Sequence, residues 1–307
     1  MGSFGRALDR LGAGGVLAVG AVLAAALVVV YLVAHENDGL DPARGSLSST
    51  DPGVVHVHGL GVDPGDGMLY AATHAGLFRL PEGGDAVRVA DRFQDTMGFT
   101  VVGPGRFLGS GHPDVREMTR DGLPPLLGLI ESDDAGGTWR NLSLSGQSDF
   151  HVLVAAHGLV YGYDATNGRL MVTEDRVRWE NRSTVVLGSF AVDPADPEHL
   201  LGTLEGVVTA SSSDGGRAWN AVRGAPSLTV LAWDEEGGLW GASADGTAWR
   251  GTQGGAAWER RGALGGTPEA FLATDEALYA AAEGVGVLQS HDGGITWTVR
   301  YEERPGE

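Results

Sequence analysis

Residues 212–219 read Ser-Ser-Asp-Gly-Gly-Arg-Ala-Trp, and two closely similar octapeptides occupy residues 132–139 and 290–297. All three begin with Ser, carry Asp at the third place and Gly at the fifth, and end with Trp. Degenerate copies end at Trp179 and Trp258, so five Trp residues follow one another at intervals of 40, 40, 39 and 39 residues. A nearly constant interval of this length is the sequence signature of a repeat architecture.

The octapeptide predicts a β-turn. Its Asp carboxylate accepts hydrogen bonds from backbone N–H groups further along the turn, and its Gly adopts the positive φ that other residues avoid. The Trp then begins the next strand, where we expect its indole to fill the space between neighbouring sheets. A structural role is therefore predicted for Ser132, Asp134, Gly136, Thr138, Trp139, Ser212, Asp214, Gly216, Trp219, Ser290, Asp292, Gly294, Thr296 and Trp297.

The first half of each period also repeats. An apolar strand is followed by a second strand with small residues at its centre, as in residues 54–60 and 69–74, and this pair occurs six times between residues 53 and 304. Each repeat has about 42 residues, the size of a four-stranded blade. We therefore predict an all-β fold, a six-bladed β-propeller over residues 53–304. Its first blade lacks the Trp and is expected to use residues 86–90 as its fourth strand.

The octapeptide resembles the Asp-box of the BNR-repeat propellers, a superfamily that includes sialidases, sortilin and a photosystem assembly factor. In that family the box joins the third and fourth strands of a blade, on the rim away from any active site. Sortilin and the assembly factor bind polypeptides, so the resemblance implies a binding module. Small bacterial membrane-anchored propellers with a similar first strand are often labelled glycosyl hydrolases on the basis of the repeat.

Ligands of such propellers usually meet one face, formed by the turns between second and third strands and the starts of the innermost strands. On this face we expect His56, His58, His74, Asp95, His112, Asp149, His151, Asp164, Glu205, Asp245, Glu269 and Glu283. Five of the nine His residues of the chain fall on this face, in the first three blades.

A divalent metal is the cofactor that this face suggests. Imidazoles and carboxylates that converge on a pore are suitable ligands for Zn²⁺, Cu²⁺ or Mn²⁺. His56 and His58 are two residues apart on a predicted strand, so their side chains point to the same side, and His151 is the third nominated ligand. The alternative is that these His residues only bond to backbone carbonyls and that no metal is required.

A glycosyl hydrolase is the alternative function, either like an exo-sialidase or another glycosidase that uses pore-facing carboxylates. Residues 77–81, Leu-Phe-Arg-Leu-Pro, resemble a sialidase signature, but Arg79 falls in a predicted third strand. No innermost strand begins with an Arg, so the Arg cluster that holds a substrate carboxylate is absent there. Tyr301 and Glu302, the only adjacent Tyr and Glu, fall in the last outer strand. We therefore expect binding rather than catalysis.

Residues 112–125 form the one clear insertion, between the second and third strands of the second blade. A long loop on the ligand face is either a lid or partner surface, or a tolerated surface insertion.

Composition and the N-terminal segment predict the location of the chain. Its 40 acidic residues outnumber 21 basic ones, giving a formal charge of −19 that disfavours nucleic acid as a partner. The absence of Cys excludes disulfides and thiolate metal sites. Residues 12–34 carry no charge over 23 positions, or roughly 34 Å as a helix, which is sufficient to cross a bilayer.

Arg residues precede this segment and acidic residues follow it, which predicts that the N-terminus is inside the cell. We expect residues 1–11 to be a cytoplasmic tail, residues 12–34 a single transmembrane helix and residues 35–52 a flexible linker. The propeller would then be extracytoplasmic and bind an unidentified protein or glycan. A cleaved signal peptide is the alternative for the apolar segment.

Overall fold

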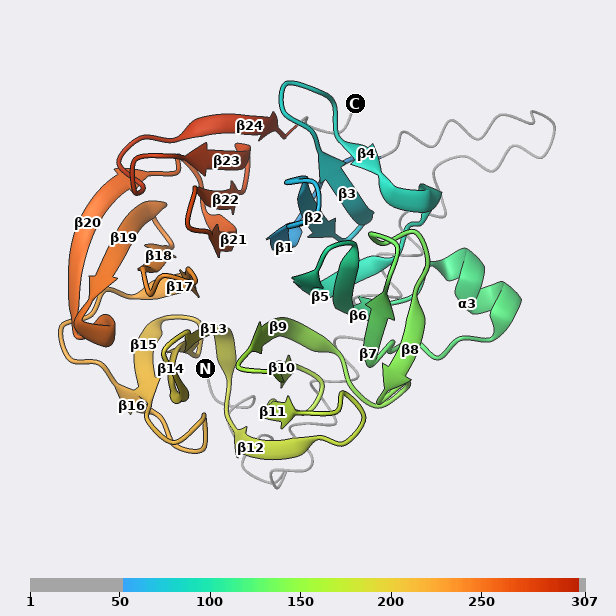
Figure 1. The fold of residues 1–307 in the computed structure, drawn as a ribbon, viewed down its shortest axis with the longest axis horizontal. Coiled ribbons are helices and arrows are strands. Elements are labelled where there is room, and N and C mark those ends of the chain that lie inside the picture. The colour runs from blue at the N-terminus through green and yellow to red at the C-terminus, as the bar shows by residue number, and fades with distance from the viewer. Residues whose placement is uncertain (1–51, 304–307) are drawn as a thin grey trace, which may run out of the picture. The chain divides into compact units, whose positions relative to one another are not determined.

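The computed structural model describes residues 52–303, and these form six antiparallel four-stranded sheets arranged as blades around a central axis (Figure 1). The predicted six-bladed β-propeller is thus confirmed. Blades one to three comprise β1 (Val57–Val62), β2 (Leu69–Thr73), β3 (Gly76–Leu80), β4 (Val87–Arg88), β5 (Asp95–Gly103), β6 (Arg106–His112), β7 (Leu129–Ser132), β8 (Arg140–Ser143), β9 (Phe150–Ala156), β10 (Leu159–Asp164), β11 (Arg169–Thr173) and β12 (Glu180–Thr184).

Blades four to six comprise β13 (Leu187–Asp193), β14 (Asp196–Leu204), β15 (Val208–Ser212), β16 (Asn220–Ala221), β17 (Leu228–Trp233), β18 (Leu239–Ser243), β19 (Thr247–Thr252), β20 (Ala257–Ala263), β21 (Pro268–Ala273), β22 (Leu278–Ala282), β23 (Gly286–Ser290) and β24 (Thr298–Glu302). The helical elements are η1 (Val89–Asp91), α3 (Val115–Asp121) and η2 (Gln253–Gly255). Within residues 52–303, no helix is long and apolar enough to cross a membrane. The predicted span at residues 12–34 lies outside the described residues.

Each blade is a meander of four consecutive strands, so the last blade closes on the first without exchanging a strand. Side-chain contacts join the two blades instead. The Val57 amide donates to Glu269 Oε2 at 3.1 Å, and the Arg300 guanidinium donates to the Leu80 carbonyl at 3.3 Å. One apolar cluster also combines residues of both blades, including Leu60 of β1 and Val287 of β23. Apolar packing therefore contributes to ring closure.

Burial is greatest in the second strand of a blade, between the partly exposed innermost strand and the exposed outermost strand, which explains why the small-residue strand repeats so clearly. Every residue of β2 is buried, whereas β24 is exposed or half-buried. A side chain at Gly162 of β10 would place its Cβ 2.6 Å from the Phe150 ring, and one at Gly202 of β14 would lie 2.9 Å from the Trp219 ring. Glycine at these two places lets an aromatic ring lie against the backbone.

The recurring Trp residues pack between adjacent blades. Trp139 of the second blade packs with Leu77 of the first and Phe107 of the second. Trp219 of the fourth blade likewise packs with Leu170 of the third and Leu200 of the fourth. The near-constant spacing of the indoles is therefore the spacing of the blade interfaces.

The three octapeptides form turns that join the third strand of a blade to the fourth. Ser212 Oγ donates to Asp214 Oδ1 at 2.8 Å and accepts a hydrogen bond from the Gly216 amide at 2.9 Å. The same carboxylate accepts from the Ala218 amide at 2.9 Å, and these hydrogen bonds hold its pKa below the usual value. The turns at Asp134 and Asp292 repeat this arrangement, and there a Thr hydroxyl also donates to the Asp.

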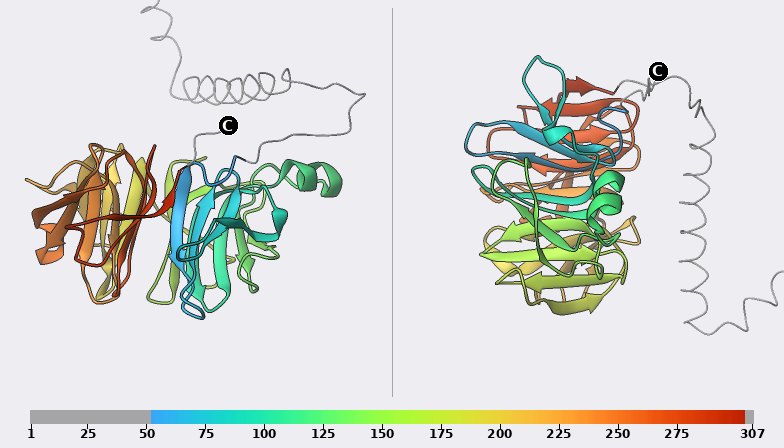
Figure 2. Two further views of the ribbon diagram at one scale, coloured as in Figure 1. Left: turned by 90° about the horizontal axis from the view of Figure 1, so that it is seen from above. Right: turned by 90° about the vertical axis from the view of Figure 1, so that its right-hand side faces the viewer.

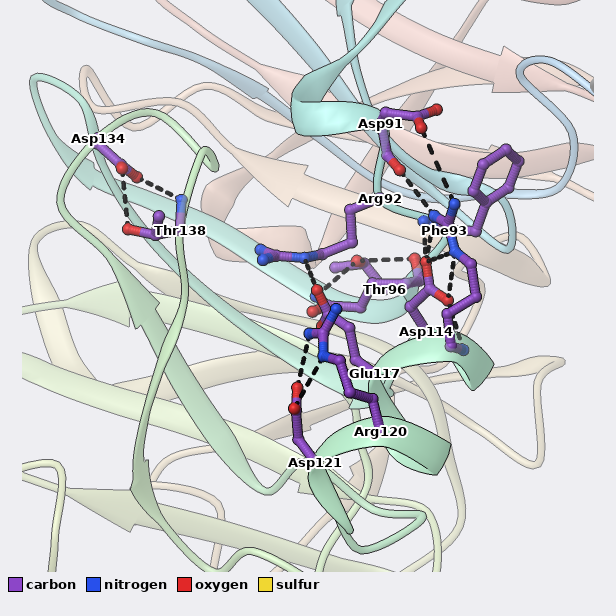
Figure 3. Close-up of polar contacts among 12 residues, drawn as sticks. Asp91, Arg92, Phe93, Thr96, Asp114, Glu117, Arg120, Asp121, Asp134 and Thr138 are labelled. Atoms are coloured by element: carbon purple, nitrogen blue, oxygen red, sulfur yellow. Dashed lines mark hydrogen bonds and ion pairs between the residues drawn. The ribbon is translucent and has the colours of Figure 1, made fainter.

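The insertion of the second blade contains helix α3, which lies at the outer edge of the ring (Figures 1 and 2). Figure 3 shows how the helix is held against the segment that links the first two blades. Asp114 caps the helix by accepting from the Arg116 amide, and it also accepts from the Phe93 amide at 2.9 Å. Arg92 donates to Glu117 at 2.9 Å. These contacts favour a fixed peripheral element over a lid.

Candidate functional site

Each innermost strand carries a β-bulge near its start. In β1, Val57 pairs with Thr73 and Gly59 with Ala72, so the intervening His58 has no partner in the ladder. A bulge of this kind re-aims the side chain of the unpaired residue. The corresponding residues of the six blades, here called the mouth ring, are His58, Met97, His151, Gly188, Thr229 and Glu269.

The innermost strands of all six blades enclose a central channel with a cavity of about 440 Å³. His58, Met97, His151 and Glu269 of the mouth ring belong to its lining. The lining is otherwise mostly aliphatic, with Leu, Val and Ala from the middle of each strand. Three of the four ionisable lining residues, His58, His151 and Glu269, thus stand where the strands begin, whereas Glu235 follows the end of β17. The end with the two imidazoles is where a polar ligand would be recognised.

The tightest group of donors combines two His residues of the first blade with one Asp of the second. One ring nitrogen each of His58 and His74 and one carboxylate oxygen of Asp95 lie within 4.8 Å of one another. His74 Nδ1 is 2.9 Å from Asp95 Oδ1, and His58 Nε2 is 3.9 Å from the same oxygen. The two imidazole rings meet edge to face, with centroids 4.3 Å apart. No other three His, Asp or Glu side chains within residues 52–303 meet this distance criterion.

The environment keeps His58 neutral. Burial, and next the neighbouring His74, lower the pKa of His58 from 6.5 to about 4, and the opposing attraction of Asp95 is smaller. His58 Nε2 is buried and makes no hydrogen bond within the described part of the chain. The hydrogen bond to Asp95 raises the pKa of His74. At neutral pH the site therefore contains an imidazole, His58, that is available as a ligand.

His56 and Glu269 stand beside this group, at the interface of the first and last blades. His56 Nδ1 is 3.5 Å from Glu269 Oε1, and the His56 side chain is 64% exposed. Burial raises the pKa of Glu269 even though the carboxylate accepts the Val57 amide. The His56 ring also meets the His74 ring, with centroids 5.3 Å apart.

A second polar cluster lies one blade further round. His151 Nε2 is 2.8 Å from Asp149 Oδ2, and His112 Nε2 is 3.6 Å from the same oxygen. The nominated metal ligands His56, His58 and His151 are thus distributed over two clusters instead of forming one three-donor group.

The other four predicted face residues lie at or just after the end of the second strand of a blade, and Asp164 and Asp245 are held by hydrogen bonds within their own blades. Asp164 is buried and accepts from Ser148 Oγ, the Asp149 amide and Asn167. Asp245 accepts from Ser243 Oγ and the Thr247 amide within its own turn. Glu205 and Glu283 follow β14 and β22, in the fourth and sixth blades.

The residues considered for a sialidase lie away from the channel. Arg79 belongs to β3, and Tyr301 and Glu302 belong to β24, the outermost strand of the last blade. The described lining of the cavity contains no Arg. The channel therefore lacks the guanidinium groups that would hold a substrate carboxylate.

Sequence reasoning placed His74 and Asp95 on the ligand face but did not nominate them as metal ligands. A usable signal was present: His74 is in the turn after the second strand of one blade, and Asp95 begins the innermost strand of the next. In a propeller these two places adjoin across every blade interface.

Comparison with known proteins identifies the fold. No protein-family model matches the chain, and no curated protein matches it either. Among solved structures, the chain is similar to a nidogen/laminin complex (14% identity, 76% of this chain and 92% of that chain, TM-score 0.59). It is also similar to XC5397, a gluconolactonase from Xanthomonas campestris (13% identity, 76% and 85%, TM-score 0.58). A third similar structure is YCF48 bound to a D1 peptide (16% identity, 80% and 81%, TM-score 0.48). At these identities, the first two similarities establish that the chain shares the β-propeller fold.

Proposed function

We propose that this chain is a non-catalytic, membrane-tethered extracytoplasmic propeller of the Asp-box type, which binds a divalent transition-metal ion at the mouth of its central channel. The apolar segment at residues 12–34 and the charges on either side of it support the tether and its orientation. The three octapeptides and their Asp-centred turns support the Asp-box assignment.

The observation that carries the metal proposal is the convergence of His58, His74 and Asp95. Two imidazoles and one carboxylate are a frequent donor set for Zn²⁺ and other divalent transition metals. Ligands about 2.0–2.1 Å from a tetrahedral ion are about 3.3 Å apart. The distances of 2.9 and 3.9 Å from Asp95 Oδ1 to the two ring nitrogens bracket this value.

Three protein ligands leave at least one coordination position of the ion open. His58 belongs to the lining of the channel cavity, so the open position would be reached from the channel. A carboxylate or carbonyl oxygen of a peptide or glycan is a suitable group for that position. The metal would thus supply the polar contact and the aliphatic channel wall the apolar one.

Isothermal titration calorimetry of the full chain with Zn²⁺ and Cu²⁺ tests the proposal. We expect a saturable site in the wild type and at least a tenfold weaker interaction in His74→Ala. His291→Ala is the matched control, because His291 is exposed in an octapeptide turn and should leave binding unchanged. Equal binding by the wild type and His74→Ala, or no binding by the wild type, would refute the proposal.

A further inference from the structure

We infer that the metal of the channel mouth is copper and that Met97 binds it as a further ligand, so that the site accepts monovalent Cu⁺ as well as a divalent ion. This inference rests on the proposed function, because it names the metal of the site formed by His58, His74 and Asp95. Three observations support it: the place of Met97 in the mouth ring, the contacts that hold its strand against the first blade, and the position of its side chain outside the apolar core.

Met97 is the counterpart, in the second blade, of His58 in the first. Each is the residue that a bulge near the start of its strand leaves without a ladder partner. Gly111, on β6 opposite the bulge of β5, has a φ of 130°. A Cβ there would lie 2.1 Å from the Asp95 carbonyl oxygen and 2.8 Å from the Met97 nitrogen, so the bulge requires glycine at this place. The second blade therefore re-aims Met97 as the first blade re-aims His58.

Contacts on both sides of Met97 hold its strand against the first blade. Asp95, two residues before Met97, has its Oδ1 3.9 Å from His58 Nε2. Phe99 is two residues after Met97, and a Cβ at Gly59 would lie 3.1 Å from Phe99 Cβ. The bulge of β5 is thus fixed between two points that contact residues 58 and 59 of β1. A Met side chain has three rotatable bonds and adapts to irregular gaps, so its sulfur can turn towards an ion held by His58 and Asp95.

Met97 belongs to the channel and not to the apolar core. It is half-buried and lies in the lining of the channel cavity. Within residues 52–303, none of the apolar clusters includes Met97, whereas Met68 and Met171 pack into such clusters. The thioether of Met97 is therefore accessible to an ion at the channel mouth.

Two imidazoles, a carboxylate and a thioether form a donor set that suits copper in both oxidation states. Thioether sulfur is a soft ligand that selects Cu⁺, and imidazole is a ligand for copper and zinc alike. Zn²⁺ is bound in proteins by Cys, His, Asp and Glu, and Met is not among its usual ligands. Met97 should therefore raise the affinity of the site for Cu⁺ and leave the affinity for Zn²⁺ nearly unchanged.

The test is an anaerobic competition for Cu⁺ between the full chain and bathocuproine disulfonate, a chelator that becomes coloured when it binds Cu⁺, with ascorbate as the reductant. Met97→Leu nearly conserves the side-chain volume, and we expect it to weaken Cu⁺ binding at least tenfold and to change the Zn²⁺ affinity less than twofold. Met118→Leu is the matched control, because Met118 lies on α3 at the outer edge of the ring (Figure 1), and it should bind both ions like the wild type. Circular dichroism melting of the metal-free variants checks that each is folded.

X-ray absorption at the copper edge gives a second, direct measurement. The chain contains no Cys, so a sulfur ligand contributed by the chain must come from Met. Scattering from a sulfur neighbour of Cu⁺ should be present in the wild type and in Met118→Leu, and absent in Met97→Leu.

The outcomes separate this inference from the proposed function. Zn²⁺ binding that His74→Ala weakens, together with equal Cu⁺ affinities of the wild type and Met97→Leu, overturns the role of Met97 and leaves the proposed function intact. Equal losses of Cu⁺ and Zn²⁺ binding in Met97→Leu also overturn that role, because a thioether ligand would discriminate between the two ions. Cu⁺ binding with sulfur scattering, but without binding of Zn²⁺ or Cu²⁺, supports Met97 as a copper ligand and overturns the divalent site. No binding of any of these ions by the wild type overturns both proposals.

Discussion

His58 should make the stability of the propeller depend on pH. The pKa of its imidazole is about 4 in the folded chain, against an ordinary value of 6.5. Between these two values the unfolded chain binds a proton that the folded chain does not, so the free energy of unfolding falls as the pH falls. One pKa unit corresponds to about 1.4 kcal/mol, so the full contribution of His58 is about 3 kcal/mol. It is complete above pH 6.5 and lost by pH 4.

Other groups of the site also titrate, so the contribution of His58 must be isolated by substitution. The pKa of His74 is raised, and its contribution has the opposite sign, because it stabilises the fold at low pH and is lost as the pH rises through its folded value. Asp95, His56 and His151 also influence His58. The useful quantity is therefore the difference between the wild type and His58→Gln, which keeps a polar side chain but removes the titration.

Urea unfolding of both proteins at pH 7.5 and 4.5, with chelator present, measures this difference. From pH 7.5 to 4.5 the wild type should lose about 2.5 kcal/mol more than His58→Gln. The chemical shift of the His58 ring protons, followed by NMR, gives the folded pKa directly. Parallel pH profiles for the two proteins, or a measured pKa near 6.5, would refute the reasoning about burial.

Three further predictions concern the blade interfaces, the turns and catalysis. Gly202→Val should lower the free energy of unfolding, measured in urea, by about 1–3 kcal/mol, because the new Cβ would lie 2.9 Å from the Trp219 ring. An unchanged urea midpoint would contradict the close packing of Trp219 against this strand. Ser212→Ala should lower the free energy of unfolding by about 1–3 kcal/mol in the same assay, because the Gly216 amide loses its hydrogen-bond acceptor. A loss below about 0.5 kcal/mol would show that water replaces the hydroxyl as the acceptor. The chain should release no nitrophenol from a panel of nitrophenyl glycosides, and activity abolished by Glu205→Ala or Glu283→Ala would instead favour a glycosidase.

The sequence alone predicted the repeat and hence the fold. The interval between indoles equals the length of a blade because one indole packs at each of five of the six blade interfaces, as Trp139 and Trp219 do, while the interface of the last and first blades has none among the described residues. The small residues of the second strand could also be recognised in the sequence, because they lie against bulky rings such as that of Phe150 and cannot be larger. The small-residue strand recurs in all six blades and the Trp in five, so a single sequence contains several copies of the signal.

Only the tertiary structure decided which polar side chains meet. Of the set nominated from sequence, His56, His58 and His151, the first two were assumed to alternate regularly along one strand, whereas His56 precedes β1 and a bulge at His58 interrupts the ladder. His74 and Asp95, the actual neighbours of His58, are contributed by a turn and by the next blade. The alternation of polar and apolar residues along a strand predicts which side of the strand faces the channel. It contains no information on contacts across a blade interface, because those depend on the angle and distance at which two independently formed sheets pack.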